Sequence, residues 1–357
     1  MALSKEENIQ YSRHLILDKI GVSGQEKLKE AKVLIIGAGG LGCPILQYLT
    51  AAGVGTIAVV DHDVVEQSNL QRQILFTHED IGKPKAEVAV KRLAQLNPYI
   101  NLQPIVEKLT AENALNLFEY YDIIVDGTDN FPTRYLINDA AIITSKPVVF
   151  GSIFKFDGQV SVFNYESGPS YRCLFPNPPK FNTVPNCSEI GVLGILPGII
   201  GCLQANEVIK IICNLEGILS GKLLTFSALS LNQTIFRFKK NKEKKITSLE
   251  KNYEFFCNIP TSISEITFSE LKTLDKPYAL LDVRTDIERE HFNIGGLHIP
   301  LAEIYNHLAE IPTKNPLIVY CKSGIRSKVA IQILKEKGFK NTLINLKNGI
   351  LAVPLDN

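Results

Sequence analysis

The chain has 357 residues, which suggests two domains at ~150 residues each. Hydrophobic residues make up 45% and charged residues 21%, which excludes a disordered chain, and the net charge of +1 argues against electrostatic binding of nucleic acid. The N-terminal sequence MALSKEENIQYSRHL lacks an apolar core, so no secretory signal is expected. The seven irregularly spaced cysteines favour free thiols in a reducing cytoplasm.

In the first half of the chain, short β-rich runs alternate with helical runs. Strands are predicted at residues 32–37, 55–61, 121–129 and 146–152. Glycines follow the first strand, and Gly53 is predicted to cap the apolar helix behind them. This alternation predicts a mainly parallel sheet that is covered by helices on both faces.

The pattern changes after residue 152. The run FKFDGQVSVFNY predicts a hairpin around Asp157-Gly158, followed by a helix at about 191–214 and two strands near 222–238. The apolar stretch in that helix falls short of the ~20 residues that a bilayer requires, so we expect a buried helix and no membrane span. The first domain is therefore predicted to be an α/β fold with a parallel half and a partly antiparallel half.

A basic polar run at residues 238–252 has no apolar period and is predicted to be a solvated linker. We place the first domain at 1–240, the linker at 241–262 and a second, small α/β domain at 263–357. In the second domain, YALLDV and LIVYC are predicted strands, and IRSKVAIQILKEKGF is a predicted helix.

A glycine-rich turn links the first strand to its helix. Its sequence is GAGGLG, with glycines at Gly37, Gly39, Gly40 and Gly42. Glycines at this place allow a tight turn and let backbone N–H groups approach phosphate at a helix N-terminus. Asp61 ends the next strand, where a carboxylate can hold ribose hydroxyls. Taken alone, this motif favours an NAD-dependent oxidoreductase.

Other polar residues shift the prediction towards a triphosphate. Lys85 begins a later helix, and Asp129 and Asn130 follow the fourth strand. The run after the second strand adds Ser68, Asn69, Leu70, Gln71 and Arg72. A triphosphate needs Arg and Lys donors and a carboxylate that holds Mg²⁺, whereas helix dipoles suffice for the pyrophosphate of a dinucleotide.

These motifs resemble the MoeB/ThiF branch of the E1-like activating enzymes. The matching segments are YSRHLIL, GAGGLG, DHDVVEQSNLQRQ, GKPKAE and TDN, within about residues 5–240. The resemblance implies a Rossmann-like adenylation domain that uses ATP and Mg²⁺ to adenylate the C-terminal Gly-Gly of a ubiquitin-fold sulfur carrier, of the molybdopterin (MoaD) or thiamine (ThiS) type. The residues that it assigns to ATP are Gly40, Asp61, Asn69, Arg72, Lys85, Asp129 and Asn130, with Asp129 on Mg²⁺. Arg13 would enter the site of a neighbouring subunit, which implies a homodimer.

Two further features of that family concern cysteines. Cys187 lies where the family has a cysteine that can take the activated carrier as a thioester or acyl disulfide; the alternative is a structural thiol, because adenylation needs no cysteine. Many relatives hold Zn²⁺ with two Cys-x-x-Cys pairs, but here each window keeps a single cysteine, Cys173 or Cys257. Structural zinc normally needs four N or S ligands, so we expect no zinc.

A second candidate site follows the strand LIVY in the second domain. Its loop residues are Cys321, Lys322, Ser323, Gly324 and Arg326. A loop here points successive N–H groups at its centre, which would stabilise a thiolate or a persulfide anion, and its two cations add positive charge. The loop form also fits small tyrosine phosphatases. The upstream segment LLDVRTDIEREHFNIGGLHIPL resembles the rhodanese fold, over about residues 263–352, and implies that Cys321 carries persulfide sulfur. Asp282 and Arg284 are predicted to be structural.

The combined prediction is a sulfur-carrier adenylyltransferase with a sulfurtransferase domain. Its partners would be the carrier, a cysteine desulfurase or another sulfur donor, and a second copy of the chain. Two alternatives stay open: an NAD-dependent oxidoreductase, and a non-catalytic scaffold that docks ubiquitin-like proteins. Nicotinamide binding or ATP–pyrophosphate exchange would discriminate among the three.

Overall fold

The computed structural model describes residues 2–179, 191–241, 246–257 and 263–353, apart from the side chain of Phe255. The chain forms two compact units, which divide after Cys257. Each unit has its own sheet and its own hydrophobic core. The prediction of an α/β fold in two domains is confirmed.

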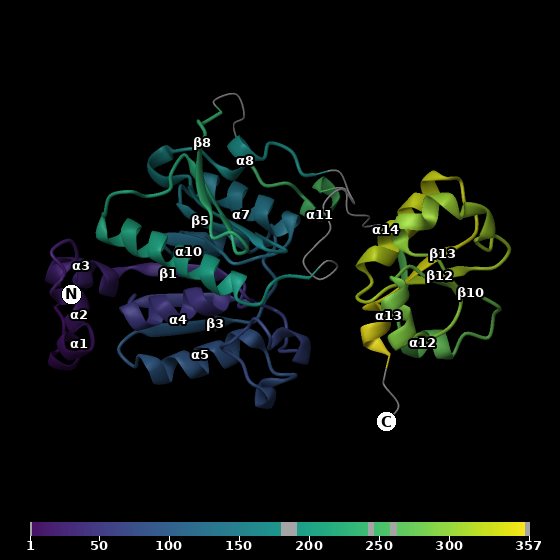
Figure 1. Ribbon diagram of the computed structural model, residues 1–357, viewed down its shortest axis with the longest axis horizontal. Coiled ribbons are helices and arrows are strands. Elements are labelled where there is room, and N and C mark those ends of the chain that lie inside the picture. Colours follow the sequence, from purple (N-terminus) through teal and green to yellow (C-terminus); the bar gives the residue numbers. More distant parts are fainter. Residues whose placement is uncertain (1, 180–190, 242–245, 258–262, 354–357) are drawn as a thin grey trace. The chain divides into compact units, whose positions relative to one another are not determined.

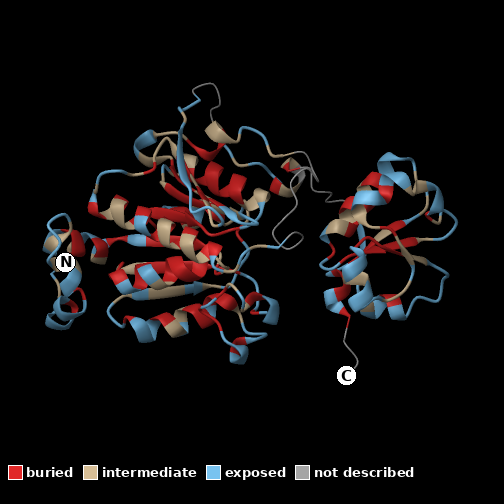
Figure 2. Ribbon diagram, viewed as in Figure 1, coloured by how far each residue is buried: buried red, intermediate tan, exposed pale blue. Residues whose placement is uncertain are grey.

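The first unit is built on an eight-stranded sheet with the order β3-β2-β1-β4-β5-β6-β7-β8 (Figure 1). The first five strands in this order run parallel, and the last three pairings are antiparallel. The strands are β1 (Lys32–Ile36), β2 (Thr56–Val60), β3 (Asn101–Ile105), β4 (Ile123–Asp126), β5 (Val148–Phe154), β6 (Asp157–Phe163), β7 (Lys222–Ser227) and β8 (Gln233–Arg237). As predicted, a parallel half joins an antiparallel half, and Figure 2 shows that the central strands are largely buried.

The helices of the first unit cover the sheet. They are α1 (Lys5–Gln10), α2 (Ser12–Leu15), α3 (Gly21–Glu30), α4 (Gly42–Ala52), α5 (Lys85–Leu96), α6 (Ala114–Glu119), α7 (Phe131–Ile143), α8 (Tyr171–Leu174), α10 (Leu196–Cys213) and α11 (Tyr253–Phe256). The chain steps from β1 to β3 in one direction and from β4 to β5 in the other. Because such crossovers are right-handed, α4 and α5 cover one face, while α6 and α7 cover the opposite face. The strand order reverses between β1 and β4, which is where α/β sheets bind ligands.

The predicted hairpin is present, but its turn is not at Asp157-Gly158. The two strands turn at Lys155 and Phe156, and Asp157 already pairs with Phe154. Lys155 takes the positive φ that the turn requires, 53°. Gly158 serves packing instead, because a Cβ there would overlap the side chain of Ile200 on α10.

Helix α10 is a core element of the first unit. By length and composition alone it could cross a membrane. It packs against α4, β5 and β6, and two of its polar side chains are buried with partners. Gln204 donates to the carbonyl oxygen of Asp126 at 2.8 Å, and Glu207 accepts from the backbone N–H of Leu219 at 2.9 Å. These contacts agree with the prediction of a buried helix.

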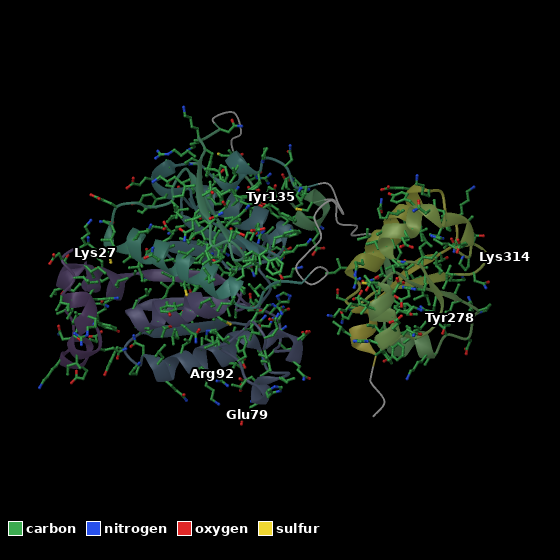
Figure 3. The ribbon with its side chains drawn as sticks, in the orientation of Figure 1. Lys27, Glu79, Arg92, Tyr135, Tyr278 and Lys314 are labelled. Atoms are coloured by element: carbon green, nitrogen blue, oxygen red, sulfur yellow. The ribbon has the colours of Figure 1, made fainter. Side chains whose placement is uncertain are left out.

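The segment 241–262, predicted to be a linker, contains helix α11, which packs on α7. Asp139 of α7 is buried and accepts two hydrogen bonds from Arg172, at 2.7 and 2.6 Å. The hydroxyl of Tyr253 donates to the same carboxylate at 2.8 Å. Tyr135, labelled in Figure 3, and Phe256 stack beside the guanidinium of Arg172. The basic polar run ends at residue 252, before Tyr253 and Phe256, and residues 253–257 belong to the first unit.

The second unit has a five-stranded, fully parallel sheet with the order β11-β10-β12-β13-β9. Its strands are β9 (Ser264–Ile266), β10 (Ala279–Asp282), β11 (Leu297–His298), β12 (Leu317–Tyr320) and β13 (Leu343–Leu346). Its helices are α12 (Phe268–Lys272), α13 (Asp286–His291), α14 (Ile325–Glu336) and the 3₁₀ helices η4 (Leu301–Asn306), η5 (Leu308–Glu310) and η6 (Gly349–Ala352). The strand-then-helix pattern predicted from LIVYC onward corresponds to β12 and α14.

Candidate functional site

The glycine loop between β1 and α4 lies at the point where the strand order reverses. Gly37 has φ of 98°, and a Cβ on it would lie 2.9 Å from the carbonyl oxygen of Gly127, which follows β4. A Cβ on Gly42 would overlap the carbonyl oxygen of Gly37. A Cβ on Gly39 would not be crowded, because the nearest side-chain atom to that position is 3.9 Å away. At Gly40 a Cβ would lie 3.1 Å from Pro197 of α10, so the loop is tight except at Gly39, where backbone N–H groups can approach a phosphate.

Asp61 ties this loop to the end of β2. One carboxylate oxygen accepts the N–H of Ala38 at 2.7 Å, and the other accepts the N–H of Asp63 at 2.8 Å. Burial raises the pKa of Asp61, against the opposing charge of Lys85 and the two amide hydrogen bonds. The structure thus gives the predicted ribose ligand an additional role, which is to shape the glycine loop.

Lys85 brings a cation to the same end of the sheet. It is the first residue of α5, its side chain is buried, and its ammonium group donates to Asp63 at 3.1 Å. Among the described residues the acidic partner of this ammonium group is the exposed carboxylate of Asp63, and a lysine paired in this way can exchange that partner for a phosphate. Lys85 therefore lies beside Asp63, two residues after the predicted ribose ligand Asp61, and its role in binding ATP stays a prediction.

The run from Ser68 to Gln73 forms the other wall of the loop. Asn69 is buried, and its side chain accepts the backbone N–H of Glu66 at 3.1 Å. Arg72 donates to the carbonyl oxygen of Ser68 at 3.0 Å, and its Cγ lies 3.6 Å from the Cβ position of Gly40. Arg72 is thus beside the glycine loop. Leu70 packs on the core, while Ser68 and Gln71 are exposed.

Gln73 belongs to the same wall but was not predicted to be a site residue. Its side chain is buried, and its Oε1 has no hydrogen-bond partner among the residues that the structure describes. Its Nε2 is the atom 3.9 Å from the Cβ position of Gly39. A buried amide next to the open part of the loop is a candidate nucleotide contact. The sequence signal that could have identified Gln73 as a site residue is its position at the end of the motif SNLQRQ.

The loop between β4 and α7 carries Asp129 and Asn130, which are both exposed. Asn130 caps α7, because its side-chain oxygen accepts the N–H of Thr133 at 3.0 Å. Gly127 donates to the carbonyl oxygen of Ile36 at 2.9 Å, which fixes this loop beside β1. The Asp129 loop and the glycine loop therefore lie next to each other at the carboxyl ends of β4 and β1.

Arg13 does not join these residues within the chain. Its neighbour Tyr11 packs on Gly53, which caps the C-terminal end of α4, whereas the glycine loop is at the N-terminal end. An 11-residue helix is ~16 Å long, so Arg13 lies at the far end of α4. Cys187, the other predicted catalytic residue of this unit, lies outside the described residues.

The second candidate site surrounds Cys321, which is fully buried after β12. Its sulfur accepts the backbone N–H of Gly324 at 3.1 Å and faces the hydroxyl of Ser327 at 3.4 Å. Gly324 takes φ of 87°, and α14 begins directly after it. Lys322 and Ser323 are exposed on the rim. The loop therefore directs the backbone N–H of Gly324 and the N-terminus of α14 towards the thiol, an arrangement that favours an anion.

The expected contribution of Arg326 to the charge of this loop is wrong in part. Both terminal nitrogens of its guanidinium donate to the carboxylate of Glu288, each at 2.7 Å. Burial alone would raise the pKa of Glu288, but the hydrogen bonds and charge of Arg326, together with hydrogen bonds from Thr285, lower it to about 2. Glu288 thus neutralises the arginine, whereas Lys322 has no acidic partner among the residues that the structure describes.

Two structural features close this second unit. The Asp282 carboxylate accepts hydrogen bonds from Arg284 at 2.9 and 2.7 Å, and both side chains are buried, as expected for a strand-end brace. At the C-terminus, Ile350 donates its N–H to the carbonyl oxygen of Cys321 at 2.8 Å. Gly349 is required there, because a Cβ would overlap the same oxygen. The last 3₁₀ helix therefore closes directly on the cysteine loop.

The two windows in which relatives carry zinc ligands are filled differently here. Cys173 accepts the N–H of Ser170 and of Asn241, each at 3.3 Å, and Cys257 is buried with a pKa raised by burial to about 12. In the described chain, the group of three metal-capable side chains that lie together is Asp61, His62 and Asp63, not these windows. The absence of zinc stays a prediction.

Comparison with known proteins agrees with both units. The chain matches the ThiF family over residues 11–248 and the rhodanese-like domain over residues 267–353. It is 43% identical to a probable adenylyltransferase/sulfurtransferase MoeZ of Mycobacterium tuberculosis, over 98% of this chain and 94% of that protein. It is 48% identical to a sulfur carrier protein adenylyltransferase of Thermus thermophilus, over 72% of this chain and 100% of that one.

A third relative is the adenylyltransferase and sulfurtransferase MOCS3 of Aedes aegypti, 41% identical over 94% of this chain and 84% of that protein. A crystal structure of E. coli MccB with ATP shares the fold, with a TM-score of 0.59 and 23% identity over 69% of this chain and 75% of that chain. The chain therefore belongs to the ThiF family, and it is an adenylyltransferase of that family that carries a C-terminal rhodanese-like sulfurtransferase domain.

Proposed function

We propose that the chain adenylates the C-terminal glycine of a ubiquitin-fold sulfur carrier and then converts it to a thiocarboxylate with sulfur carried on Cys321. The observation that supports this best is that the glycine loop, Lys85 and the Asp129 loop all follow the carboxyl ends of adjacent parallel strands, at the point where the strand order reverses. A relative named a sulfur carrier protein adenylyltransferase, which aligns over its whole length, supports the same substrate class.

In the first step, a carboxylate oxygen of the carrier attacks the α-phosphorus of ATP, the bond to the bridging oxygen breaks, and pyrophosphate leaves. No general base is needed, because the attacking group is already an anion. The barrier is the approach of an anion to a polyanion, and Arg72, Lys85 and Arg13 of a second subunit would lower it by neutralising charge. Asp129 would hold the Mg²⁺ that enters with ATP and shields the phosphate charge.

In the second step, a persulfide anion on Cys321 attacks the activated carbonyl, AMP leaves, and an acyl disulfide forms. A second thiolate then attacks the sulfur of Cys321, which frees the thiocarboxylate and leaves a disulfide. Cys187 is our candidate for that thiolate, and a thiol reductant would regenerate Cys321. A cysteine desulfurase or another persulfide donor in the cytoplasm would reload it.

Carrier-dependent ATP–pyrophosphate exchange tests the first step. We expect the wild-type chain to exchange with at least one purified carrier that ends in Gly-Gly, and Asp129→Ala to abolish the exchange. Glu119→Ala is the matched control, because Glu119 is exposed on α6, which covers the sheet away from the glycine loop. Exchange that persists in Asp129→Ala would reject the role of Asp129, and NADH binding without ATP binding would favour the oxidoreductase.

Mass measurement of the carrier tail tests the second step. With a sulfur donor present, Cys321→Ser should leave exchange intact and remove thiocarboxylate formation. Cys202→Ser is the control, because Cys202 is a half-buried thiol on α10 whose pKa is raised by burial. Thiocarboxylate formation at the wild-type rate in Cys321→Ser would overturn this step.

A further inference from the structure

A buried arginine that was not predicted from the sequence forms a hydrogen bond to the backbone of the β4–α7 loop. Arg134, on the first turn of α7, donates through Nη2 to the carbonyl oxygen of Thr128 at 2.9 Å. Its Nε lies 4.0 Å from a carboxylate oxygen of Asp126, the last residue of β4. The guanidinium thus links the end of the strand to the residue that directly precedes Asp129.

The same loop is drawn back onto the strand by Asp126. One oxygen of that carboxylate accepts both the N–H and the hydroxyl of Thr128, at 2.9 and 2.6 Å. Burial raises the pKa of Asp126, and the charge of Arg134 opposes this rise. On the other side, Gln204 of α10 donates to the backbone oxygen of Asp126 at 2.8 Å. Residues 126–128 are therefore held by side chains from two helices.

Packing keeps the arginine fixed in this position. Arg134 is 8% exposed, and its guanidinium lies over the ring of Phe150 at 5.4 Å and beside Phe131 at 5.9 Å. A buried guanidinium between aromatic rings has few alternative rotamers. Because the residue is 8% exposed and one arm of its guanidinium holds the backbone of Thr128, Arg134 offers little surface to a nucleotide.

From this geometry we infer that Arg134 is a positioning residue for the site: it fixes the backbone from which Asp129 and Asn130 project, and so sets the affinity for Mg·ATP. The inference rests on the proposed function, which makes Asp129 the magnesium ligand. It adds that the binding competence of Asp129 depends on a side chain that does not touch the nucleotide.

Binding of Mg·ATP to the full chain, measured by calorimetry, tests this inference. Arg134→Lys keeps the positive charge near Asp126 but lacks the second arm of the fork, so we expect about a tenfold weaker Mg·ATP affinity, the effect of one charge-assisted hydrogen bond. ATP binding in EDTA should change much less. In an Asp129→Asn background, Arg134→Lys should cause little further loss, because both changes act through one carboxylate.

Arg172→Lys is the matched control. Arg172 is also a buried arginine; its guanidinium binds Asp139 of α7 and lies over the rings of Tyr135 of α7 and Phe256 of α11, and none of its described contacts is with residues 127–130. It should lower stability and leave the Mg·ATP affinity unchanged. Equal weakening in both arginine variants would show a general structural effect and overturn the inference.

Hydrogen exchange without nucleotide provides a second measurement that does not depend on ATP. The amides of residues 127–130 should exchange faster in Arg134→Lys than in the wild type, while those of β1 stay protected. Unchanged exchange there would overturn the inference even if affinity falls. If the wild-type chain fails to bind Mg·ATP although exchange at the loop responds as expected, the proposed function fails and the positioning role of Arg134 in the loop stands.

Discussion

Removal of one hydroxyl group, by Tyr253→Phe, should weaken the attachment of helix α11 to the first unit. The hydroxyl donates to the buried carboxylate of Asp139 at 2.8 Å, and that carboxylate also takes two bonds from Arg172. Hydrogen bonds to charged groups contribute ~1.5–3 kcal/mol, whereas the phenylalanine ring keeps the packing on Phe256. Because Arg172 still neutralises Asp139, we expect the unfolding free energy to fall by the lower end of this range, ~1.5 kcal/mol.

Pulse proteolysis of the full chain at increasing urea concentrations measures this loss of unfolding free energy. The quantity followed is the amount of the first unit that survives the protease. Tyr120→Phe is the control, because Tyr120 is 73% exposed and should be neutral. Arg172→Ala should cost more, ~3–5 kcal/mol, since it leaves a buried carboxylate without its counter-ion. A Tyr253→Phe variant as stable as the control, with amides of α11 no less protected, would refute the view that this hydrogen bond anchors the helix.

Three further predictions concern the glycine loop, the cysteine loop and the subunit arrangement. Gly42→Ala should reduce Mg·ATP affinity by at least tenfold, because the new Cβ overlaps the carbonyl oxygen of Gly37 and displaces the phosphate turn. Gly198→Ala is the control and should be tolerated, because a Cβ there has no neighbour nearer than 3.9 Å. Equal Mg·ATP affinities of the two variants in calorimetry would contradict this prediction. The pKa of Glu288 is about 2 in the folded state against 4.5 ordinarily, so its ion pair stabilises the second unit above pH 4.5 and loses that effect as the pH falls towards 2. Acid unfolding followed by circular dichroism should therefore be shallower in Glu288→Gln over that range, and an unchanged profile would contradict the assignment. If Arg13 serves a neighbouring site, mixing inactive Arg13→Ala and Asp129→Ala chains should restore about a quarter of the wild-type exchange activity, and no recovery would argue against shared sites.

The parallel half of the first unit and the glycine loop could be predicted from the sequence, because strand periodicity and a strand–glycine–helix junction are local signals. Gly158 shows the limit of such signals. The pair Asp157-Gly158 is a typical turn signal, yet the glycine is required by the approach of Ile200, more than 40 positions later in the chain. Only the packed structure reveals that contact.

The same limit applies to the charged residues. Arg326 was expected to act on the cysteine loop, but Glu288 from another helix neutralises it. Arg134 and Arg172 each lie in polar or mixed segments and carry no motif, so neither the loop support nor the anchor of α11 could be predicted. The chemistry of a side chain can be read locally, whereas its partner is set by tertiary packing.

Helix α10 makes the nucleotide crevice inseparable from the antiparallel half of its unit. A Cβ on Gly201 would meet the carbonyl oxygen of Leu41 at 2.6 Å, beside the glycine loop, and Gln204 reaches the end of β4. A fragment cut after the fifth strand would keep almost every ligand assigned to ATP and still lose the wall against which those ligands are held. Nucleotide binding in this protein is thus a property of the whole unit, and minimal versions of the enzyme have to retain the chain through residue 213.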